Sequence, residues 1–341
     1  AVADDGTGKG YDGWLCTFYV YDDFANLRCV IQPQAVKIMI ETGNWTLSSY
    51  LDGFCFRYEY DERGRMIMKK VPDAGEVYMV YDARDRLVLT QDANLRNQGK
   101  WMYTVYENLF NRPVASGLWN NNGTRTFHHT QAYNSVSYPN LTGQTIEELT
   151  VSFYDNYNWL AGYGNPLNSS YNASYDSYFQ PVNGIWPYAQ SNSATSTLRG
   201  MVTGTRVKVL GGSNYIYTVN IYDSKGRPIQ VQSTNLTGGI DITTTQYNWA
   251  GQPLIIVQKL QKAGINQQTT ILVTQLTYDE AGRLVKTEKR ISNSLVNGGA
   301  MSAFKIVSQL EYDALGQLKK KILGTGSNTN GALETENFEY N

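Results

Sequence analysis

A seven-residue phrase, Tyr-Asp-x-x-Gly-Arg-apolar, recurs along this chain of 341 residues and restricts the folds that the chain can adopt. Four close matches begin at Tyr60, Tyr222, Tyr278 and Tyr312, the last with Gln in place of Arg. Looser copies begin at Tyr21, Tyr81, Tyr106, Tyr154 and Tyr247. Repetition at a variable period of a few tens of residues indicates an array of similar supersecondary units.

Each phrase has the residues that a hairpin turn requires. Before Tyr60, the aromatic residues Phe54, Phe56 and Tyr58 alternate with other residues as in a half-buried strand. The Asp can accept hydrogen bonds from amides ahead of it, and the Gly can adopt the positive φ that reverses the chain. The Arg then reaches solvent or a neighbouring carboxylate, and an apolar residue starts the return strand. We therefore predict an all-β chain, an array of antiparallel β-hairpins.

The close matches supply the predicted structural residues of the turns. They are Tyr60, Asp61, Gly64 and Arg65; Tyr222, Asp223, Gly226 and Arg227; Tyr278, Asp279, Gly282 and Arg283; and Tyr312, Asp313 and Gly316. Two looser copies replace the Gly by Ala25 and Asp85, and Asp tolerates a positive φ better than Ala does.

The phrase resembles the YD repeat of the Rhs family, which comprises bacterial repeat proteins related to animal teneurins and to shell components of insecticidal toxin complexes. The resemblance covers nearly the whole chain, and residues 14–31 and 234–239 are similar to Rhs-type chains of Bacteroidetes-like bacteria. It implies one continuous module over residues 1–341, in which a long antiparallel sheet spirals into a hollow shell.

The resemblance also implies a role and a set of partners. Rhs-type shells enclose and deliver a C-terminal toxin, which follows a self-cleaving segment with an Asp-Pro step, and this sequence has no Asp-Pro dipeptide. We therefore expect a structural segment of a secreted or cell-surface protein whose partners are its own further repeats, core and effector. Tyr340 and Asn341 look like a further copy cut after its second residue, with Asn in place of Asp, so we expect the repeats to continue.

The composition argues against several classes of partner. Lys plus Arg number 29 against 30 acidic residues, so the net charge does not favour nucleic acid. No apolar stretch approaches the length of a membrane span, and residues 1–5 lack the features of a signal peptide, so any export signal lies upstream or has been removed. Cys16, Cys29 and Cys55 form no even disulfide set, and we expect buried free thiols.

No motif predicts catalysis, a metal or a cofactor. His128 and His129 are the two histidines, and neighbouring residues on a strand point to opposite faces, so we expect surface or loop roles rather than chelation. The sequence has neither a GxSxG nor a GxxxxGK[ST] motif. An Asp that recurs in every unit is expected to be structural, because an enzyme needs one site. We therefore expect a protein that is not an enzyme.

An Asn-, Ser- and Tyr-rich insert over about residues 120–200 interrupts the regular repeats. We expect long ordered loops with short strands such as 148–154. Trp159, Tyr163, Trp186 and Tyr188 are candidate ligand-binding residues, because aromatic rings flanked by amides can stack on sugars or grip a protein. The alternatives are an adhesin or carbohydrate-binding module that uses these rings, or rings that pack on the sheet and plug the shell. Residues 33–41 fit a short helix or a buried strand.

Overall fold

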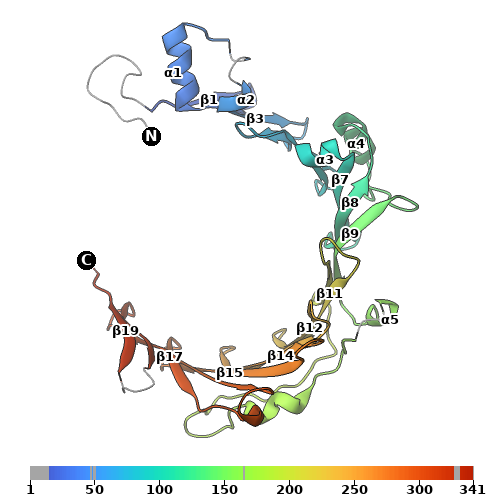
Figure 1. Cartoon of the computed structure of the whole chain (residues 1–341). Coiled ribbons are helices and arrows are strands. Elements are labelled where there is room, and N and C mark those ends of the chain that lie inside the picture. Colours follow the sequence, from blue (N-terminus) through green and yellow to red (C-terminus); the bar gives the residue numbers. More distant parts are fainter. Residues whose placement is uncertain (1–14, 47, 49–50, 164–165, 326–330, 341) are drawn as a thin grey trace. The chain divides into compact units, whose positions relative to one another are not determined.

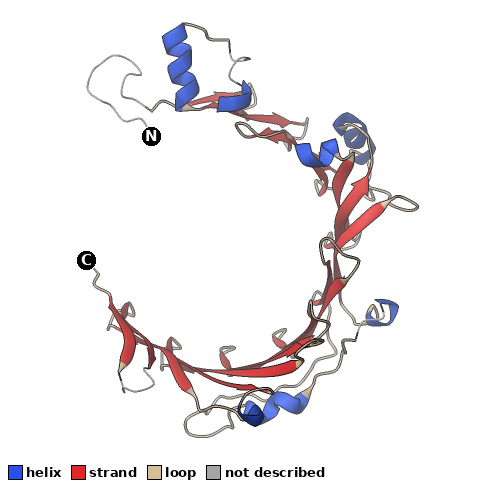
Figure 2. Cartoon of the chain, viewed as in Figure 1, coloured by secondary structure: helices blue, strands red, loops and turns tan. Residues whose placement is uncertain are grey.

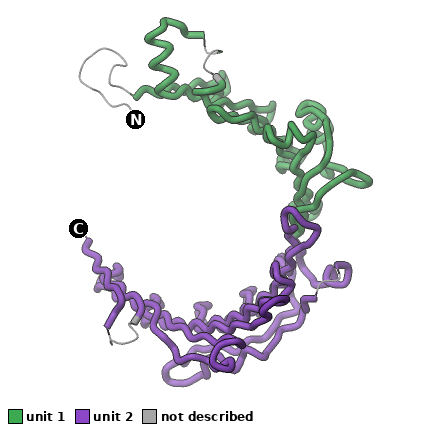
Figure 3. The backbone as a smooth tube through the Cα atoms, viewed as in Figure 1, with its two compact units in different colours: residues 1–151 green, residues 152–341 purple. Residues whose placement is uncertain are grey.

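The computed structural model describes residues 15–46, 48, 51–163, 166–325 and 331–340. The chain forms two compact units, residues 1–151 and 152–341 (Figure 3). The insert expected over 120–200 contributes to both units.

In unit 1, each strand pairs antiparallel with the next along the chain, and four helices lie between strands (Figure 1). Its strands are β1 Phe18–Tyr21, β2 Leu27–Ile31, β3 Cys55–Tyr60, β4 Met66–Lys70, β5 Val77–Tyr81, β6 Leu87–Gln91, β7 Lys100–Tyr106, β8 Pro113–Asn120 and β9 Ile146–Tyr154, whose last residues belong to unit 2. Its helices are α1 Pro33–Thr42, α2 Leu51–Phe54, α3 Ala93–Asn97 and α4 Arg125–Ala132.

Unit 2 continues the same antiparallel pattern. Its strands are β10 Val202–Lys208, β11 Tyr215–Tyr222, β12 Pro228–Thr234, β13 Ile240–Tyr247, β14 Pro253–Lys262, β15 Gln268–Tyr278, β16 Leu284–Asn293, β17 Lys305–Tyr312, β18 Leu318–Thr325 and β19 Ala332–Asn337. Its short helical segments are α5 Leu160–Tyr163, η2 Ala173–Tyr178 and η3 Asn297–Gly299. Strands predominate over helices in the described residues (Figure 2), which confirms the all-β prediction.

Every close copy of the phrase forms the turn of a hairpin. In the first, the Asp61 amide donates to the Arg65 carbonyl at 3.0 Å, and the Gly64 amide donates to the Asp61 carbonyl at 2.9 Å. Gly64 has a φ of 72°, and the same position has positive φ where it is occupied by Asp85 or Ala25. The turn therefore tolerates residues other than Gly, including the Ala that we expected to fit less well.

A β-bulge follows each turn. Tyr222 pairs with Pro228, whereas the preceding residue Ile221 pairs with Gln230, so Ile229 is an extra residue on the return strand. The same shift occurs at the other close copies and at Tyr21, Tyr81, Tyr106 and Tyr247. The extra residue increases the local twist and re-aims its own side chain, and Ile229 is buried.

Residues 33–41 belong to helix α1, which resolves the two alternatives. Pro33 occupies the first turn, where its missing amide costs nothing, and Gly43 ends the helix with a φ of 65°. The helix buries Ala35, Val36 and Met39 against a cluster of strand residues that includes Cys29 and Cys55. Cys29 and Cys55 are free and buried, as predicted, whereas Cys16 is free but only partly buried. Burial raises the pKa of Cys55 to about 11.

The turn geometry predicts the effect of a β-branched residue at Gly64. An added Cβ would meet no atom within 4 Å, so the cost of Gly64→Val is backbone strain alone. We expect a loss of about 1–3 kcal/mol in the free energy of unfolding, measured by urea denaturation. Gly64→Asn is the matched control, because Asn111 adopts a φ of 56° in the turn that follows Tyr106. Equal losses in the two variants would contradict a role for positive φ.

Candidate functional site

The Asp of each turn is held by its own hairpin. The Asp61 Oδ1 atom accepts from the amides of Arg63 and Arg65 at 3.0 Å, and its Oδ2 atom accepts from the Arg65 Nε atom at 2.7 Å. Burial alone would raise the pKa of the Asp61 carboxyl, but hydrogen bonds from the Arg65 side chain and from these two amides outweigh it and lower that pKa. Asp223 and Asp279 also accept from the amide and side chain of the Arg four residues on.

Six of the described repeat tyrosines reach back to the preceding turn, whereas the Tyr81 hydroxyl lies 3.9 Å from the Met79 sulfur. The Tyr278 hydroxyl donates to the Pro253 carbonyl at 3.0 Å, and Pro253 is six residues after the tyrosine of the preceding repeat, Tyr247. The same offset recurs in four further bonds: Tyr106 to Leu87, Tyr247 to Pro228, Tyr312 to Leu284 and Tyr340 to Leu318. A fifth bond, from Tyr222 to Val202, spans the insert that follows Tyr154.

The strand register explains why these carbonyls need a partner. Pairing between β14 and β15 begins at Ile255, two residues after Pro253, so Pro253 lies beyond the backbone ladder on that side. The Tyr278 hydroxyl supplies the hydrogen bond that the backbone pairing of the strands does not. Likewise, pairing between β12 and β13 begins at Gln230, two residues after Pro228.

In four turns the Arg also contacts the tyrosine of the next repeat. Its guanidinium lies over the ring, where a cation is attracted to the π face. The distances from guanidinium carbon to ring centroid are 5.0 Å for Arg65 and Tyr81, 5.0 Å for Arg86 and Tyr106, 4.7 Å for Arg227 and Tyr247, and 4.6 Å for Arg283 and Tyr312. Each Arg thus binds its own Asp and the following repeat. We call these contacts, together with the tyrosine bonds, the ladder.

The copy at Tyr154 corrects one expectation, because it is not the tip of a hairpin. The Asp155 amide donates to the Met201 carbonyl at 3.1 Å, and the Asp155 Oδ1 atom accepts from the Gly200 amide at 2.6 Å. Gly200 has a φ of 83°, and the Tyr222 hydroxyl then bonds Val202. Gly200, Met201 and Val202 therefore occupy the places of Gly, Arg and the apolar residue in a repeat that is split.

Residues 156–199 interrupt this split repeat, and glutamines of the sheet hold part of them. The Gln230 side chain accepts from the Asn172 amide at 3.0 Å and donates to the Asn172 carbonyl at 2.9 Å. Gln246 makes the same pair of bonds with Gln180, each at 2.9 Å. A buried glutamine amide thus acts as a short piece of neighbouring strand for the insert.

Trp159 and Tyr163, two of the four candidate ligand-binding residues, contact side chains of the sheet. Trp159 stacks on Phe153 with centroids 4.1 Å apart and planes at 3°, and its indole N–H donates to the Thr203 hydroxyl at 3.2 Å. A Cβ at Gly204 would lie 2.2 Å from the Trp159 ring, so the absent side chain makes room for it. Tyr163 lies beneath the Arg206 guanidinium, 4.4 Å from its centroid. Trp159 and Tyr163 therefore pack against side chains of the sheet.

The other two rings line a cavity of about 800 Å³. Its lining includes Trp186 and Tyr188 of the insert and Tyr278, Asp279 and Glu280 of a repeat turn. The structure therefore brings Trp186 and Tyr188 together and separates their role from that of Trp159.

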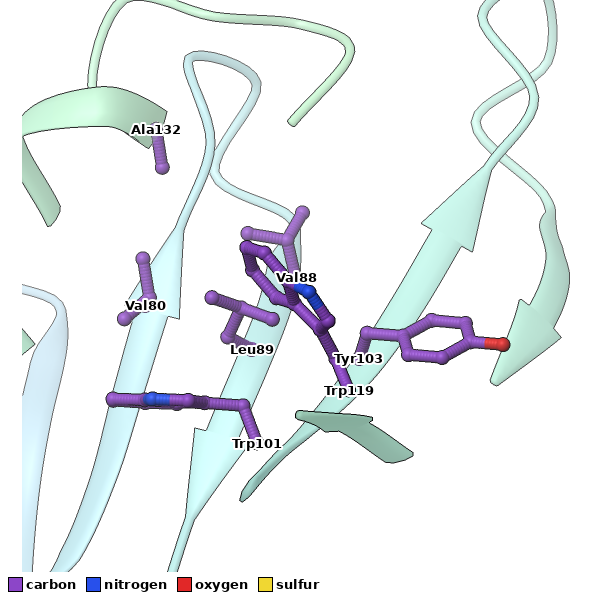
Figure 4. Close-up of a cluster of buried hydrophobic side chains, with 7 residues drawn as sticks. All are labelled: Val80, Val88, Leu89, Trp101, Tyr103, Trp119 and Ala132. Carbon is purple, nitrogen blue, oxygen red and sulfur yellow. The ribbon is translucent and has the colours of Figure 1, made fainter. Parts of the chain in front are cut away.

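The expected surface or loop role is wrong for His128. It lies on helix α4, fully buried, and its Nδ1 atom is 2.5 Å from the Tyr138 hydroxyl oxygen. Trp101 and Trp119 meet its ring edge-on, and they belong to the apolar cluster drawn in Figure 4. The helix was missed because its one clear signal is the N-cap Thr124, which accepts from the Phe127 amide. Among the described residues, no group of acidic, His or Cys side chains could hold a metal ion.

The ladder predicts a measurable loss in Tyr278→Phe, which removes one hydroxyl and leaves the Pro253 carbonyl without it. We expect a decrease of about 0.5–1.5 kcal/mol in the free energy of unfolding. Tyr188→Phe is the matched control, since its ring is exposed and its hydroxyl has no hydrogen-bond partner within the described part of the chain. Equal urea midpoints for Tyr278→Phe and the unaltered protein would contradict the ladder.

His128 predicts acid sensitivity. Burial lowers its pKa from 6.5 to about 4, so the unfolded chain takes up a proton in this range while the folded chain does not. The contribution of His128 to the free energy of unfolding is therefore retained above pH 6.5 and decreases by roughly 3 kcal/mol as the pH falls to 4. His128→Gln should flatten the pH dependence of the melting temperature in this range, whereas the control His129→Gln, on the same helix, should keep it. An unchanged slope in His128→Gln would refute the assignment.

No protein-family model and no curated protein matches the chain. Solved structures of toxin-complex components align with it. A crystal structure of TcdB2–TccC3 has 14% identity and a TM-score of 0.35 over 96% of this chain and 15% of the matched chain. The pore form of the Photorhabdus luminescens Tc holotoxin, with a TccC3 variant, has 13% identity and a TM-score of 0.26 over 92% of this chain and 20% of the matched chain. The chain therefore spans a fifth or less of each matched chain.

Proposed function

We propose that this chain is a non-catalytic wall segment of a large secreted or cell-surface protein of the Rhs type, in which the wall encloses or presents a C-terminal effector. The ladder is the observation that carries the proposal. Its recurrent polar groups bind their own turn or the neighbouring repeat, so the residues that define the repeat hold consecutive hairpins together. This is the chemistry of an extended wall.

The state of the repeat carboxylates supports a non-catalytic role. General acid or base catalysis needs a carboxyl group that can reach a substrate proton. The Asp223 carboxylate instead accepts from the Lys225 amide, the Arg227 amide and the Arg227 Nε atom at 2.7–2.9 Å. Asp61 has the same partners at the corresponding positions.

No helix among the described residues is both long and apolar enough to cross a membrane.

The proposed partners are further repeats and an effector on the same polypeptide. The experiment is a protection assay on the full-length gene product, with one recognition sequence for a site-specific protease placed in the C-terminal region. The same sequence at the N-terminus of a second version is the control. We expect the C-terminal sequence to be cut at least about tenfold more slowly, because access then requires opening of the wall.

Ladder variants make this assay specific. Tyr278→Phe combined with Tyr312→Phe should accelerate cleavage of the C-terminal sequence, because both changes remove bonds between consecutive repeats. Tyr188→Phe should leave the rate unchanged. Equal cleavage of the C-terminal and N-terminal sequences in the unaltered protein would refute enclosure, as would a gene product with no distinct C-terminal region.

A second candidate function, carbohydrate binding at a cell surface, is favoured by one observation. Trp186 and Tyr188 line a cavity, whereas Trp159 packs on the sheet.

A further inference from the structure

One buried glutamine closes the loop that bears the cavity. The Gln246 side chain accepts from the Gln180 amide and donates to the carbonyls of Gln180 and Gln190, at 2.9, 2.9 and 3.1 Å. Both ends of the segment 180–190 are therefore fixed to one residue of β13. Compact loops whose ends meet in this way are frequently functional.

The backbone of this loop is also fixed to the repeat turn beside it. The Trp249 amide donates to the Tyr188 carbonyl at 2.9 Å, and the Gln190 amide donates to the Tyr247 carbonyl at 3.0 Å. Trp186 packs against the apolar cluster that includes Leu254. The aromatic side of the cavity is thus positioned before any ligand arrives, which lowers the entropic cost of binding.

The cavity offers unused aromatic and polar surface. Tyr188 is 68% exposed. In the part of the chain that the structure describes, neither its hydroxyl nor the Trp186 indole N–H has a hydrogen-bond partner, and the Glu280 carboxylate also has none. The lining therefore combines two aromatic rings with three polar groups. The Trp186 indole N–H can donate a hydrogen bond, the Tyr188 hydroxyl can donate or accept one, and the Glu280 carboxylate can accept one.

The charge of the lining restricts the ligand. The described residues that line the cavity include Asp279 and Glu280 and no Lys, Arg or His, so an anionic ligand would meet only like charge. A wholly apolar ligand would bury the Glu280 carboxylate without a partner. The lining fits a neutral molecule that has an apolar face for the rings and hydroxyl groups at its rim. A volume of about 800 Å³ is within the range of ligand pockets.

We propose that this cavity binds a neutral saccharide chain, with Trp186 and Tyr188 as stacking surfaces and Glu280 as a hydroxyl acceptor. A pyranose ring has an apolar C–H face that stacks on an aromatic ring and hydroxyls that bind a carboxylate, which is the combination that the lining offers. The proposal makes the second candidate function specific, and it does not depend on enclosure of an effector.

The test uses the 341-residue chain and three neutral tetrasaccharides, cellotetraose, maltotetraose and tetra-N-acetylchitotetraose, with calorimetry and saturation-transfer NMR. We expect at least one to bind, and Trp186→Ala and Tyr188→Ala each to weaken binding by about tenfold or more. Because Tyr188 is exposed, its variant should fold even if Trp186→Ala does not. Glu280→Gln should also weaken binding of the same saccharide.

Trp249→Ala is the matched control, because this exposed tryptophan lies on the adjoining turn outside the cavity lining and stacks with Lys225. It should keep the affinity within about twofold. The proposal is overturned if none of the three tetrasaccharides binds, if binding survives Tyr188→Ala unchanged, or if Trp249→Ala abolishes it. The wall assay has a different readout, so failure of one proposal leaves the other standing.

Discussion

The hydrogen bond that recurs from repeat tyrosines to the preceding turn, as from Tyr278 to Pro253, is the interaction on which the linkage of the described hairpins depends. Backbone pairing with the next strand stops two residues before the turn, as it does at Ile255, and the Pro253 carbonyl therefore lies beyond that pairing. A tyrosine is long enough to place its hydroxyl there, as Tyr278 does, and its ring then lies beside the cation of a neighbouring turn, as the ring of Tyr312 lies beside Arg283. One residue type thus completes the backbone hydrogen bonding near the turns and links consecutive hairpins.

The split repeat shows how little of the phrase this linkage requires. Asp155 and Gly200 are far apart in sequence, yet the Asp155 carboxylate accepts from the Gly200 amide, the Asp155 amide donates to the Met201 carbonyl, and Val202 receives a tyrosine bond. The entropic cost of closing a loop grows only logarithmically with its length, so a long insertion between Asp and Gly is tolerated if both ends retain their partners. The array therefore carries a sizeable surface feature and keeps its repeat.

Local chemistry explains what the sequence could predict. The turns, the positive φ at Gly64 and the hairpin order follow from residues within seven positions of one another. The contacts between repeats do not, because the offset from Tyr278 to Pro253 appears only when the strands are in register. Helix α4 and the buried His128 were missed for a related reason, since their packing partners Trp101 and Trp119 come from strands upstream. The division between Trp159 and Trp186 likewise depends on where the insert contacts the sheet.

The glutamines determine that division. An irregular segment that lies on a sheet must satisfy its buried backbone groups, and buried Gln230 and Gln246 do this at Asn172 and Gln180. Between Gln180 and Gln190 the loop is held at its ends by Gln246, and within it the Tyr188 carbonyl accepts from the Trp249 amide and Ala189 is buried in the apolar cluster. Within this loop Trp186 packs on the apolar cluster, whereas the ring of Tyr188 is exposed. The same polar anchoring that makes the insert rigid therefore creates the part of its surface that is available to a ligand.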